Sequence, residues 1–207
     1  MNAKKPLFIT GIGTGIGKTV VAAILTEALK ADYWKPVQSG ELENTDSHTI
    51  GRLISNSSTV IHPEIYRLTE PLSPHRSAII DGIHINKEDF TLPDTGNNLI
   101  IEGAGGLMVP LNENFLVADL ISHLQTEAIL VSRHYLGSIN HTLLSACLLK
   151  LKGIPVKGII FSGDVNRSSE EFILNYTGLS LLGYVPELGV IDKEQIRKCG
   201  DGIDLGA

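Results

Sequence analysis

The sequence has few cysteines, no long apolar run and no cluster of basic residues, and each absence excludes a class of protein. Its two cysteines, Cys147 and Cys199, have no spacing typical of a metal or redox site. No stretch approaches the ~20 apolar residues of a membrane-spanning helix, and the apolar stretch near the N-terminus is too short for a signal peptide. A net charge of −6 is unfavourable for a nucleic-acid surface. We therefore expect a cytoplasmic protein with no nucleic-acid partner and no membrane partner.

The composition is that of an ordinary globular protein, with 43% hydrophobic and 19% charged residues among 207. We expect one domain over residues 1–207, without linker, repeat or low-complexity tract. Cys147 lies in the apolar run LLSACLL, which predicts a buried, reduced thiol. The polar, glycine-bearing segment from Glu187 onward predicts a loosely ordered tail.

Short apolar runs alternate with longer amphipathic segments along the whole chain. Predicted strands cover residues 6–10, 33–37, 97–103, 127–132, 156–163 and 180–186, with an extended piece at 64–68. Predicted helices cover residues 18–31, 46–54, a segment from about 73, 114–124, 138–153 and 168–176. Continuous apolar strands with intervening helices indicate a parallel sheet covered on both faces. The pattern predicts an α/β fold: a three-layer, doubly wound, mostly parallel sheet of the P-loop NTPase kind.

The stretch GIGTGIGKT, residues 11–19, lies between the first predicted strand and the first predicted helix. The standard P-loop, G-x-x-x-x-G-K-[ST], would need glycine where the chain has Ile12, so this loop is one residue longer. The dinucleotide-binding pattern G-x-G-x-x-G does not match either, because its last glycine would fall at Ile16. Strand, glycine-rich turn and helix N-terminus still supply the backbone N–H groups that bind phosphate. We predict a variant P-loop in which Lys18 contacts the β- and γ-phosphates and Thr19 ligates Mg²⁺. A glycine-rich turn that serves only packing is the alternative.

Two acidic residues are candidates for the same metal ion. Glu102 stands at the end of the predicted strand NNLIIEG, and Asp46 follows the second strand through the loop QSGELENTD. Ligands gather at the carboxyl ends of parallel strands, and Mg²⁺ prefers a few oxygen ligands. We predict Thr19, Asp46 and Glu102 as the metal-binding residues. The alternatives are a solubilising charge at Glu102 and a helix cap at Asp46.

Lys35, in YWKPVQSG, lies just past the second predicted strand. Pro36 stiffens the chain after it, and Ser39-Gly40 form a polar turn at the same end of the sheet. A second cation there would neutralise charge on the γ-phosphate during a transfer step. The alternative is a solvated surface lysine.

These motifs together resemble one family. TGIGTGIGKTVV, KPVQSG, NTDS, TEPLSPH, IIEGAGGLMVPL, LGSINHTLLS and, weakly, LLGYVP follow the order found in dethiobiotin synthetases, the ATP-dependent carboxylase-cyclases of biotin synthesis. The resemblance covers nearly the whole chain, and the longer loop is also that family's form. It implies that 7,8-diaminononanoate takes up CO₂ as a carbamate, that the carbamate is activated by the γ-phosphate of ATP, and that the second amine closes a cyclic urea. Lys18 and Lys35 would hold carbamate against phosphate as the catalytic residues.

The resemblance also implies a homodimer with composite substrate sites. Thr14 and Ser39 would contact the diamine, and the helix N-terminus of a partner subunit would bind the substrate carboxylate through residues matching Gly137, Ser138, Ile139 and Asn140. Ser138 is the expected N-cap, and plain helix capping is the alternative role for this segment. His75, in SPH, is expected to make a local structural contact.

The nucleotide-binding set implied by the resemblance spans three regions. It comprises Gly13, Thr14, Gly15, Ile16, Gly17, Lys18, Thr19, Val20, Asp46, Glu102, Gly103, Ala104, Gly105, Gly163, Asp164, Pro186, Glu187, Leu188 and Gly189. Two positions depart from the family: Gly15 replaces a frequent acidic residue, and Gly163-Asp164 replaces Asn-Asp where the adenine is contacted. Since glycine offers no side-chain amide to a base edge, ATP is expected but the nucleotide preference stays open.

Three other functions stay open as alternatives. A partitioning or positioning ATPase of the related P-loop class usually has a lysine early in the loop, in a KGGxGKT arrangement, and this loop has none. A cobyrinate-amidase-like enzyme would need an added glutaminase domain, for which 207 residues leave no room. A nucleotide-binding module without turnover would not need Lys35 and Glu102.

Overall fold

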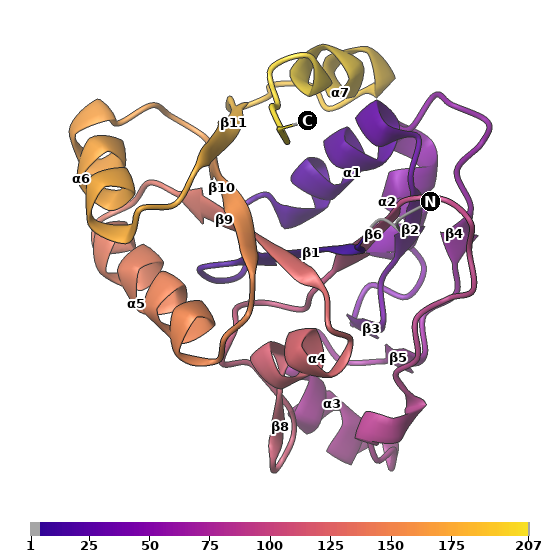
Figure 1. Cartoon of the computed structure of the whole chain (residues 1–207). Coiled ribbons are helices and arrows are strands. Elements are labelled where there is room, and N and C mark those ends of the chain that lie inside the picture. Colours follow the sequence, from indigo (N-terminus) through magenta and orange to yellow (C-terminus); the bar gives the residue numbers. More distant parts are fainter. Residues whose placement is uncertain (1–4, 207) are drawn as a thin grey trace.

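A seven-stranded parallel sheet forms the centre of the molecule in the computed structural model, which describes residues 5–206 (Figure 1). The strand order is β11-β10-β9-β1-β6-β2-β4. The strands are β1 (Leu7–Gly11), β2 (Asp32–Trp34), β4 (Ile61–His62), β6 (Leu99–Glu102), β9 (Glu127–Arg133), β10 (Val156–Ser162) and β11 (Leu181–Val185). Because β1 pairs with β6 on one side and β9 on the other, the winding direction reverses at β1. In such sheets ligands bind at this reversal, beyond the carboxyl ends of the strands.

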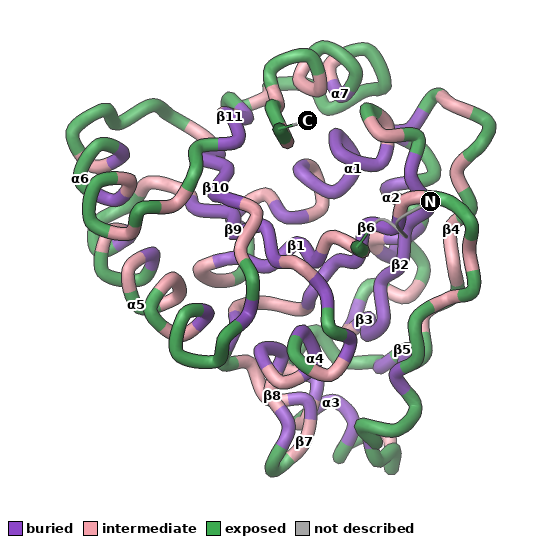
Figure 2. Tube along the Cα trace, in the orientation of Figure 1, coloured by how far each residue is buried: buried purple, intermediate pink, exposed green. Residues whose placement is uncertain are grey.

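Helices cover both faces of the sheet. They are α1 (Lys18–Leu29), α2 (Asp46–Leu53), α3 (Pro74–Asp81), α4 (Val117–His123), α5 (Ser138–Leu151), α6 (Arg167–Thr177) and α7 (Lys193–Gly200), with a 3₁₀ turn at Lys87–Asp89. Strand side chains alternate between the two cores. In β9, Ile129 and Val131 face α1 and α7, while Ala128 and Leu130 face α4, α5 and α6. The central strands are therefore buried on both sides (Figure 2), and the predicted three-layer fold is confirmed.

The predicted strand 33–37 is confirmed only at its start, because the chain leaves the sheet after Trp34. β2 ends at Trp34, and Val37–Ser39 (β3) pairs instead with Tyr66–Leu68 (β5) in a separate parallel pair. Pro36 has no N–H to donate to a ladder, and its carbonyl accepts from the N–H groups of Ile65 and Tyr66. This break places Lys35 between two sheets.

Four short strands were not predicted: β3, β4, and the antiparallel pair Pro110–Asn112 (β7) and Phe115–Leu116 (β8). β8 takes the first residues of the predicted helix 114–124, so α4 begins only at Val117. Runs of two or three residues are too short to show a period of two in the sequence.

The expectation of a loosely ordered tail after Glu187 is also wrong. Residues Lys193–Gly200 form α7, which packs on α1, and its Ile196 is fully buried. Ile196, Cys199 and Ile203 recur at helical spacing and join the core beneath α1. Three apolar positions therefore suffice to fix a segment that is otherwise charged.

Cys147 is exposed, contrary to the buried thiol predicted from LLSACLL. It lies on the outer side of α5 with Leu144 and Leu151, which are 60% and 84% exposed. The apolar run of α5 is therefore wider than the stripe that packs on the sheet.

No helix within residues 5–206 has the length and apolar character needed to cross a membrane.

Candidate active site

The glycine-rich loop joins the end of β1 to the start of α1, as the sequence predicted. Gly17 caps the helix with φ 93°, and a Cβ on it would lie 2.6 Å from Ser162 Oγ, so both conformation and space require glycine. Ile16 is 3% exposed and packs into the core beneath α1. Its side chain anchors the loop, so only its backbone is available to a ligand.

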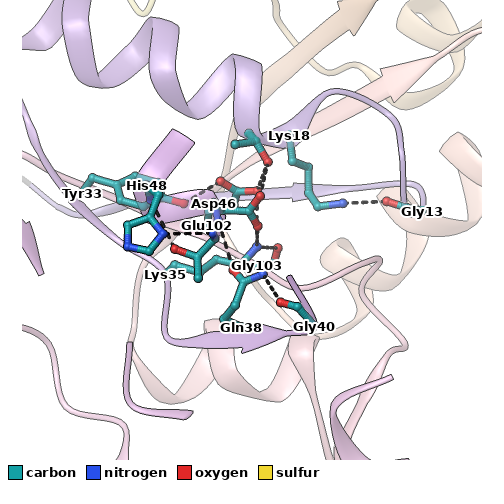
Figure 3. Close-up of polar contacts among 12 residues, drawn as sticks. Gly13, Lys18, Tyr33, Lys35, Gln38, Gly40, Asp46, His48, Glu102 and Gly103 are labelled. Carbon is teal, nitrogen blue, oxygen red and sulfur yellow. Dashed lines mark hydrogen bonds and ion pairs between the residues drawn. The ribbon is translucent and has the colours of Figure 1, made fainter. Parts of the chain in front are cut away.

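Lys18 is the first residue of α1 and bends back across the loop. Its Nζ donates to the carbonyl of Gly13 at 2.7 Å (Figure 3). Burial lowers the pKa of Lys18 to about 8; the neighbouring charge of Lys35 acts in the same direction, while Glu102 and Asp46 oppose it. The loop thus holds an ammonium group that loses its proton at a lower pH than an exposed lysine does.

Thr19, Asp46 and Glu102 converge on one point, although they come from α1, α2 and β6. The Thr19 hydroxyl lies 3.0 Å from Asp46 Oδ1 and 2.8 Å from Glu102 Oε1, so it donates to one carboxylate at a time. The other oxygen of Glu102, Oε2, accepts from the buried hydroxyl of Tyr33 at 2.7 Å. Glu102 is 1% exposed, which excludes the solubilising role left open above.

Lys35 lies between these two carboxylates and is 5% exposed, which excludes a solvated surface lysine. Its Nζ is 2.6 Å from Asp46 Oδ2 and 3.3 Å from Glu102 Oε1, and it donates to the carbonyl of Gly103 at 3.3 Å. Burial alone would lower the pKa of Lys35, but the charges of Glu102 and Asp46 outweigh it and raise that pKa. Burial raises the pKa of Asp46 and the charge of Lys35 lowers it, with a net downward shift. Lys35 and Asp46 therefore hold each other in their charged forms.

Asp46 is free of the capping role that was its alternative. Thr45 is the N-cap of α2: its hydroxyl accepts from the N–H of His48, whose Nδ1 accepts from the Thr45 N–H. Gln38 Oε1 accepts from the N–H of Asp46 at 3.3 Å. Thr45 therefore caps the helix, and the carboxylate of Asp46 contacts Thr19 and Lys35 instead.

These groups line a cleft of about 830 Å³ at the carboxyl ends of the strands. Twelve of its lining residues were predicted from the sequence: Thr14, Gly15, Gly17, Lys18, Thr19, Val20, Lys35, Ser39, Asp46, Glu102, Ala104 and Gly105. The sequence reasoning gave no role to the other nine: Val37, Gln38, Glu41, Pro71, Leu72, Ser73, Pro74, Val109 and Arg133. Arg133 directly follows the predicted strand 127–132, and ligands gather at the carboxyl ends of parallel strands. Its place in the cleft could therefore have been inferred from the sequence, as that of Glu102 was.

The segment TEPLSPH closes one side of the cleft because Gly40 permits it. A Cβ on Gly40 would lie 2.6 Å from Pro71 Cα, and its φ of 73° favours glycine as well. The neighbouring Ser39 Oγ is buried and has no hydrogen-bond partner within residues 5–206. A buried hydroxyl without a partner can serve a bound ligand. His75 makes the expected local contact, with Nδ1 at 3.0 Å from Ser73 Oγ.

The remaining predicted residues do not line this cleft. Gly163 and Glu187 both lie next to Arg133, which does line the cleft. The N-terminus of α5 does not contribute a lining residue. Its N-cap is Gly137, with φ 101° and no side-chain cap, so the prediction of Ser138 as N-cap is wrong. Glycine reaches this left-handed conformation without a clash, and Ser138 becomes the first helical residue.

Comparison with known proteins fixes the family. A family model described as an AAA domain matches residues 5–195. The ATP-dependent dethiobiotin synthetase of Christiangramia forsetii is 52% identical to the chain over 194 residues, 94% of this chain and 93% of that protein. The chain belongs to the dethiobiotin synthetase family. The synthetase of Cytophaga hutchinsonii is 54% identical over 193 residues, 93% of each protein, and that of Brucella ovis 47% over 197 residues, 95% of this chain and 92% of that protein.

Solved structures share the fold of this family member. A ParA family ATPase from Chlorobium tepidum TLS has a TM-score of 0.53 and 16% identity, covering 97% of this chain and 98% of that one. The septum site-determining protein MinD from Pyrococcus horikoshii OT3, complexed with Mg-ADP, has a TM-score of 0.56 and 17% identity, covering 97% and 87%. The predictions of a P-loop NTPase fold and an ATP-dependent ligase of the dethiobiotin synthetase family are therefore confirmed.

Proposed function

We propose that this chain forms dethiobiotin from 7,8-diaminononanoate, CO₂ and ATP, at the cleft lined by Lys18, Lys35 and Ser39. The observation that carries this assignment is the convergence of two lysines, two carboxylates and a threonine hydroxyl beside a phosphate-binding loop. Sequence identity of about half with dethiobiotin synthetases supports it.

The triphosphate binds along residues 13–20, with its terminal phosphate at Lys18. The donor set of Thr19, Asp46 and Glu102 fits Mg²⁺, because the three groups meet through oxygen atoms only and within 3.0 Å of the threonine hydroxyl. Residues 5–206 hold no group of three or more His, Cys, Asp or Glu side chains that could bind a metal ion by themselves, so the proposed site needs the threonine hydroxyl, phosphate oxygens and water as well. When bound, Mg²⁺ neutralises phosphate charge and orients the phosphate oxygens.

The residues of the cleft position and stabilise charge rather than move protons. One amine attacks CO₂, forming an N–C bond and losing a proton, to give a carbamate. A carbamate oxygen then attacks the γ-phosphorus, and the bond to ADP breaks. The second amine attacks the carbamate carbon and gives up one proton, the C–O bond to phosphate breaks, and the cyclic urea closes as phosphate leaves with the proton. Lys18 and Lys35 hold two anions together that would otherwise repel each other, and substrates that fill the cleft keep water from the mixed anhydride.

Thr14 and Ser39 contact the diamine, and a second copy of the chain completes the site. The N–H groups at the start of α5, over residues 137–140, form an anion site for the substrate carboxylate. The exposed stripe of Leu144, Cys147 and Leu151 on the same helix supports a homodimer, since exposed apolar stripes are typical of interfaces. The cytoplasm, where ATP is available, is the proposed location.

Phosphate release from ATP tests the activity. With Mg²⁺, bicarbonate and diaminononanoate, release should require the diamine and stop on chelation of the metal. The Lys152→Ala variant, which removes the cation of a surface ion pair with Asp119, should match the wild type. Hydrolysis that is independent of the diamine would favour a partitioning-type ATPase switch, the alternative with the same fold.

Subunit mixing tests the composite site. Lys18→Ala and Asn140→Asp should each have little activity alone, the second because its carboxylate repels that of the substrate while the backbone at Gly137 is left unchanged. In a mixed dimer one of the two sites carries neither change, so a mixture should recover up to about a quarter of wild-type activity. No recovery on mixing, with dimers present, would contradict a site shared between subunits.

A further inference from the structure

Three carboxylates line the cleft, and the proposed mechanism uses only two of them. Asp46 and Glu102 share the ammonium group of Lys35 and the hydroxyl of Thr19. Glu41 is exposed on the wall of the same cleft, and within residues 5–206 its side chain has no ion pair and no hydrogen bond. An ionised carboxylate of this kind is available as an acceptor for a ligand.

Glu41 also has a backbone conformation that its residue type rarely adopts, with φ 53°. Lys30 and Gln125 are the other non-glycine residues with positive φ within residues 5–206, and both lie at helix ends. Lys30 is the C-cap of α1, and Gln125 follows the C-cap of α4, where this conformation is common. Glu41 ends no helix. Unfavourable conformations away from helix ends are found most often at functional sites.

The side chain of Gln38 fixes the loop that carries Glu41 (Figure 3). Its Nε2 donates to the carbonyl of Gly40 at 3.0 Å, and its Oε1 accepts from the N–H of Asp46 at 3.3 Å. Within the loop, the N–H of Asn44 donates to the Glu41 carbonyl at 2.8 Å. Gln38 is buried, so its amide holds both ends of the loop from within the protein. The position of Glu41 on the cleft wall is therefore set before a substrate arrives.

Glu41 lies at the same end of the cleft as the Ser39 hydroxyl. It follows Ser39 by two residues, and two residues of chain span at most about 7 Å. Pro71 and Leu72 line the cleft beside them, and Pro71 contacts the intervening Gly40 so closely that a Cβ there would lie 2.6 Å from Pro71 Cα. A hydroxyl without a partner, a carboxylate and an apolar wall therefore meet in one place. This combination suits an aliphatic chain that ends in an amine.

An aliphatic diamine is positively charged at neutral pH, because an amine such as that of lysine loses its proton only at about pH 10. Its ammonium group donates hydrogen bonds and accepts none, so a carboxylate is its complementary partner. Lys18 and Lys35 line the same cleft and repel this charge. Asp46 and Glu102 are already engaged by Lys35. Glu41 is thus the carboxylate of the cleft that is left to bind a diamine.

We propose that Glu41 binds the ammonium group of the diamine and thereby determines specificity for a cationic substrate. The proposal rests on the proposed function for the presence of a diamine in this cleft. Ser39 and Glu41 contact the same end of the substrate, one through a hydroxyl and the other through a charge. Glu41 acts on substrate affinity and takes no part in the transfer of phosphate.

Steady-state phosphate release with Mg²⁺, bicarbonate, ATP and diaminononanoate tests this assignment. Glu41→Gln should raise the KM for the diamine roughly tenfold, the loss expected for a hydrogen bond to a charged group, with kcat and the KM for ATP changed less than about threefold. Because Glu41 is exposed, the rise should become smaller at high salt. Glu43→Gln is the matched control: it removes the same charge from the same loop, but Glu43 lines a separate groove between α2 and β4. Its two KM values should equal those of the wild type.

Glu41→Gly separates substrate binding from a structural role. Glycine adopts a positive φ without a clash, so the urea midpoint of this variant should not fall below that of the wild type. Its KM for the diamine should still rise roughly tenfold, since the carboxylate is lost. A residue that served only the loop would change stability and leave this KM unchanged.

An unchanged KM for the diamine in Glu41→Gln, or an equal rise in Glu43→Gln, would overturn the proposal. A rise confined to the KM for ATP would overturn it as well. If the wild type releases no phosphate in response to the diamine, the proposed function fails, and calorimetric titration of wild type and Glu41→Gln with the diamine then decides about Glu41. Weaker binding by the variant would support its role, whereas equal binding, or none by the wild type, would refute it.

Discussion

The low pKa of Lys18 makes triphosphate binding depend on pH. Burial lowers this pKa to about 8 in the free protein. A bound triphosphate stabilises the ammonium form and raises the pKa again, so binding is strongest below pH 8 and weakens as the pH rises above it. Ionisation of the terminal phosphate in this range affects wild type and Lys18→Arg alike, so the difference between the two proteins reports Lys18.

The size of the effect follows from the fraction of charged Lys18. With a pKa of about 8, this fraction is about nine tenths at pH 7 and one tenth at pH 9. Nucleotide affinity should therefore fall by about tenfold, or about 1.4 kcal/mol, between these two pH values. Binding at pH 9 should take up close to one proton per nucleotide.

Calorimetry of the β,γ-imido ATP analogue, repeated in buffers of different ionisation enthalpy, measures both quantities. Lys18→Arg is the matched control, because its guanidinium keeps its charge over the whole range. Its affinity should change less than threefold from pH 7 to pH 9, whatever its absolute value. An equal slope in wild type and Lys18→Arg, or no proton uptake at pH 9, would refute the assignment of the titrating group to Lys18.

Three further variants probe the rest of the site and its support. Lys35→Ala should lower diamine-dependent turnover by roughly 100-fold or more with circular dichroism unchanged, and near wild-type turnover would remove Lys35 from the catalytic residues. Glu102→Gln should raise the Mg²⁺ concentration needed for half-maximal turnover at least tenfold, whereas an unchanged titration would place the metal elsewhere. Ile196→Ala should cost about 2–5 kcal/mol in urea unfolding; a loss below 1 kcal/mol would mean that α7 is only loosely attached.

The local part of the site could be predicted from the sequence. Lys18 and Thr19 were found because the loop is one continuous stretch between a strand and a helix, and Glu102 because it ends an apolar strand. The same reasoning located Asp46, although only the structure assigns the cap of α2 to its neighbour Thr45. These inferences need no knowledge of distant contacts.

Contacts between remote segments could not be predicted in this way. The bond from Tyr33 to Glu102 joins residues 69 positions apart, and the pair of Arg133 and Glu187 joins residues 54 apart. Exposure of Cys147 depends on which part of an apolar helix meets the sheet, a choice that the run LLSACLL does not encode by itself. Burial of Ile196 likewise depends on the position of α1.

The hydrogen bond from Tyr33 to Glu102 restricts how that carboxylate can bind a cation. Burial, together with the charge of Glu102, raises the pKa of Tyr33 well above its ordinary value, so the phenol keeps its proton throughout the neutral range. The lone pair of Glu102 Oε2 that accepts this bond is not available to an ion, so binding through Oε1 alone is favoured over chelation through both oxygens. A large cation such as Ca²⁺, which gathers six to eight oxygens, loses more by this than compact Mg²⁺. If Glu102 ligates the proposed Mg²⁺, Tyr33 would favour a compact cation over a larger one without contacting it.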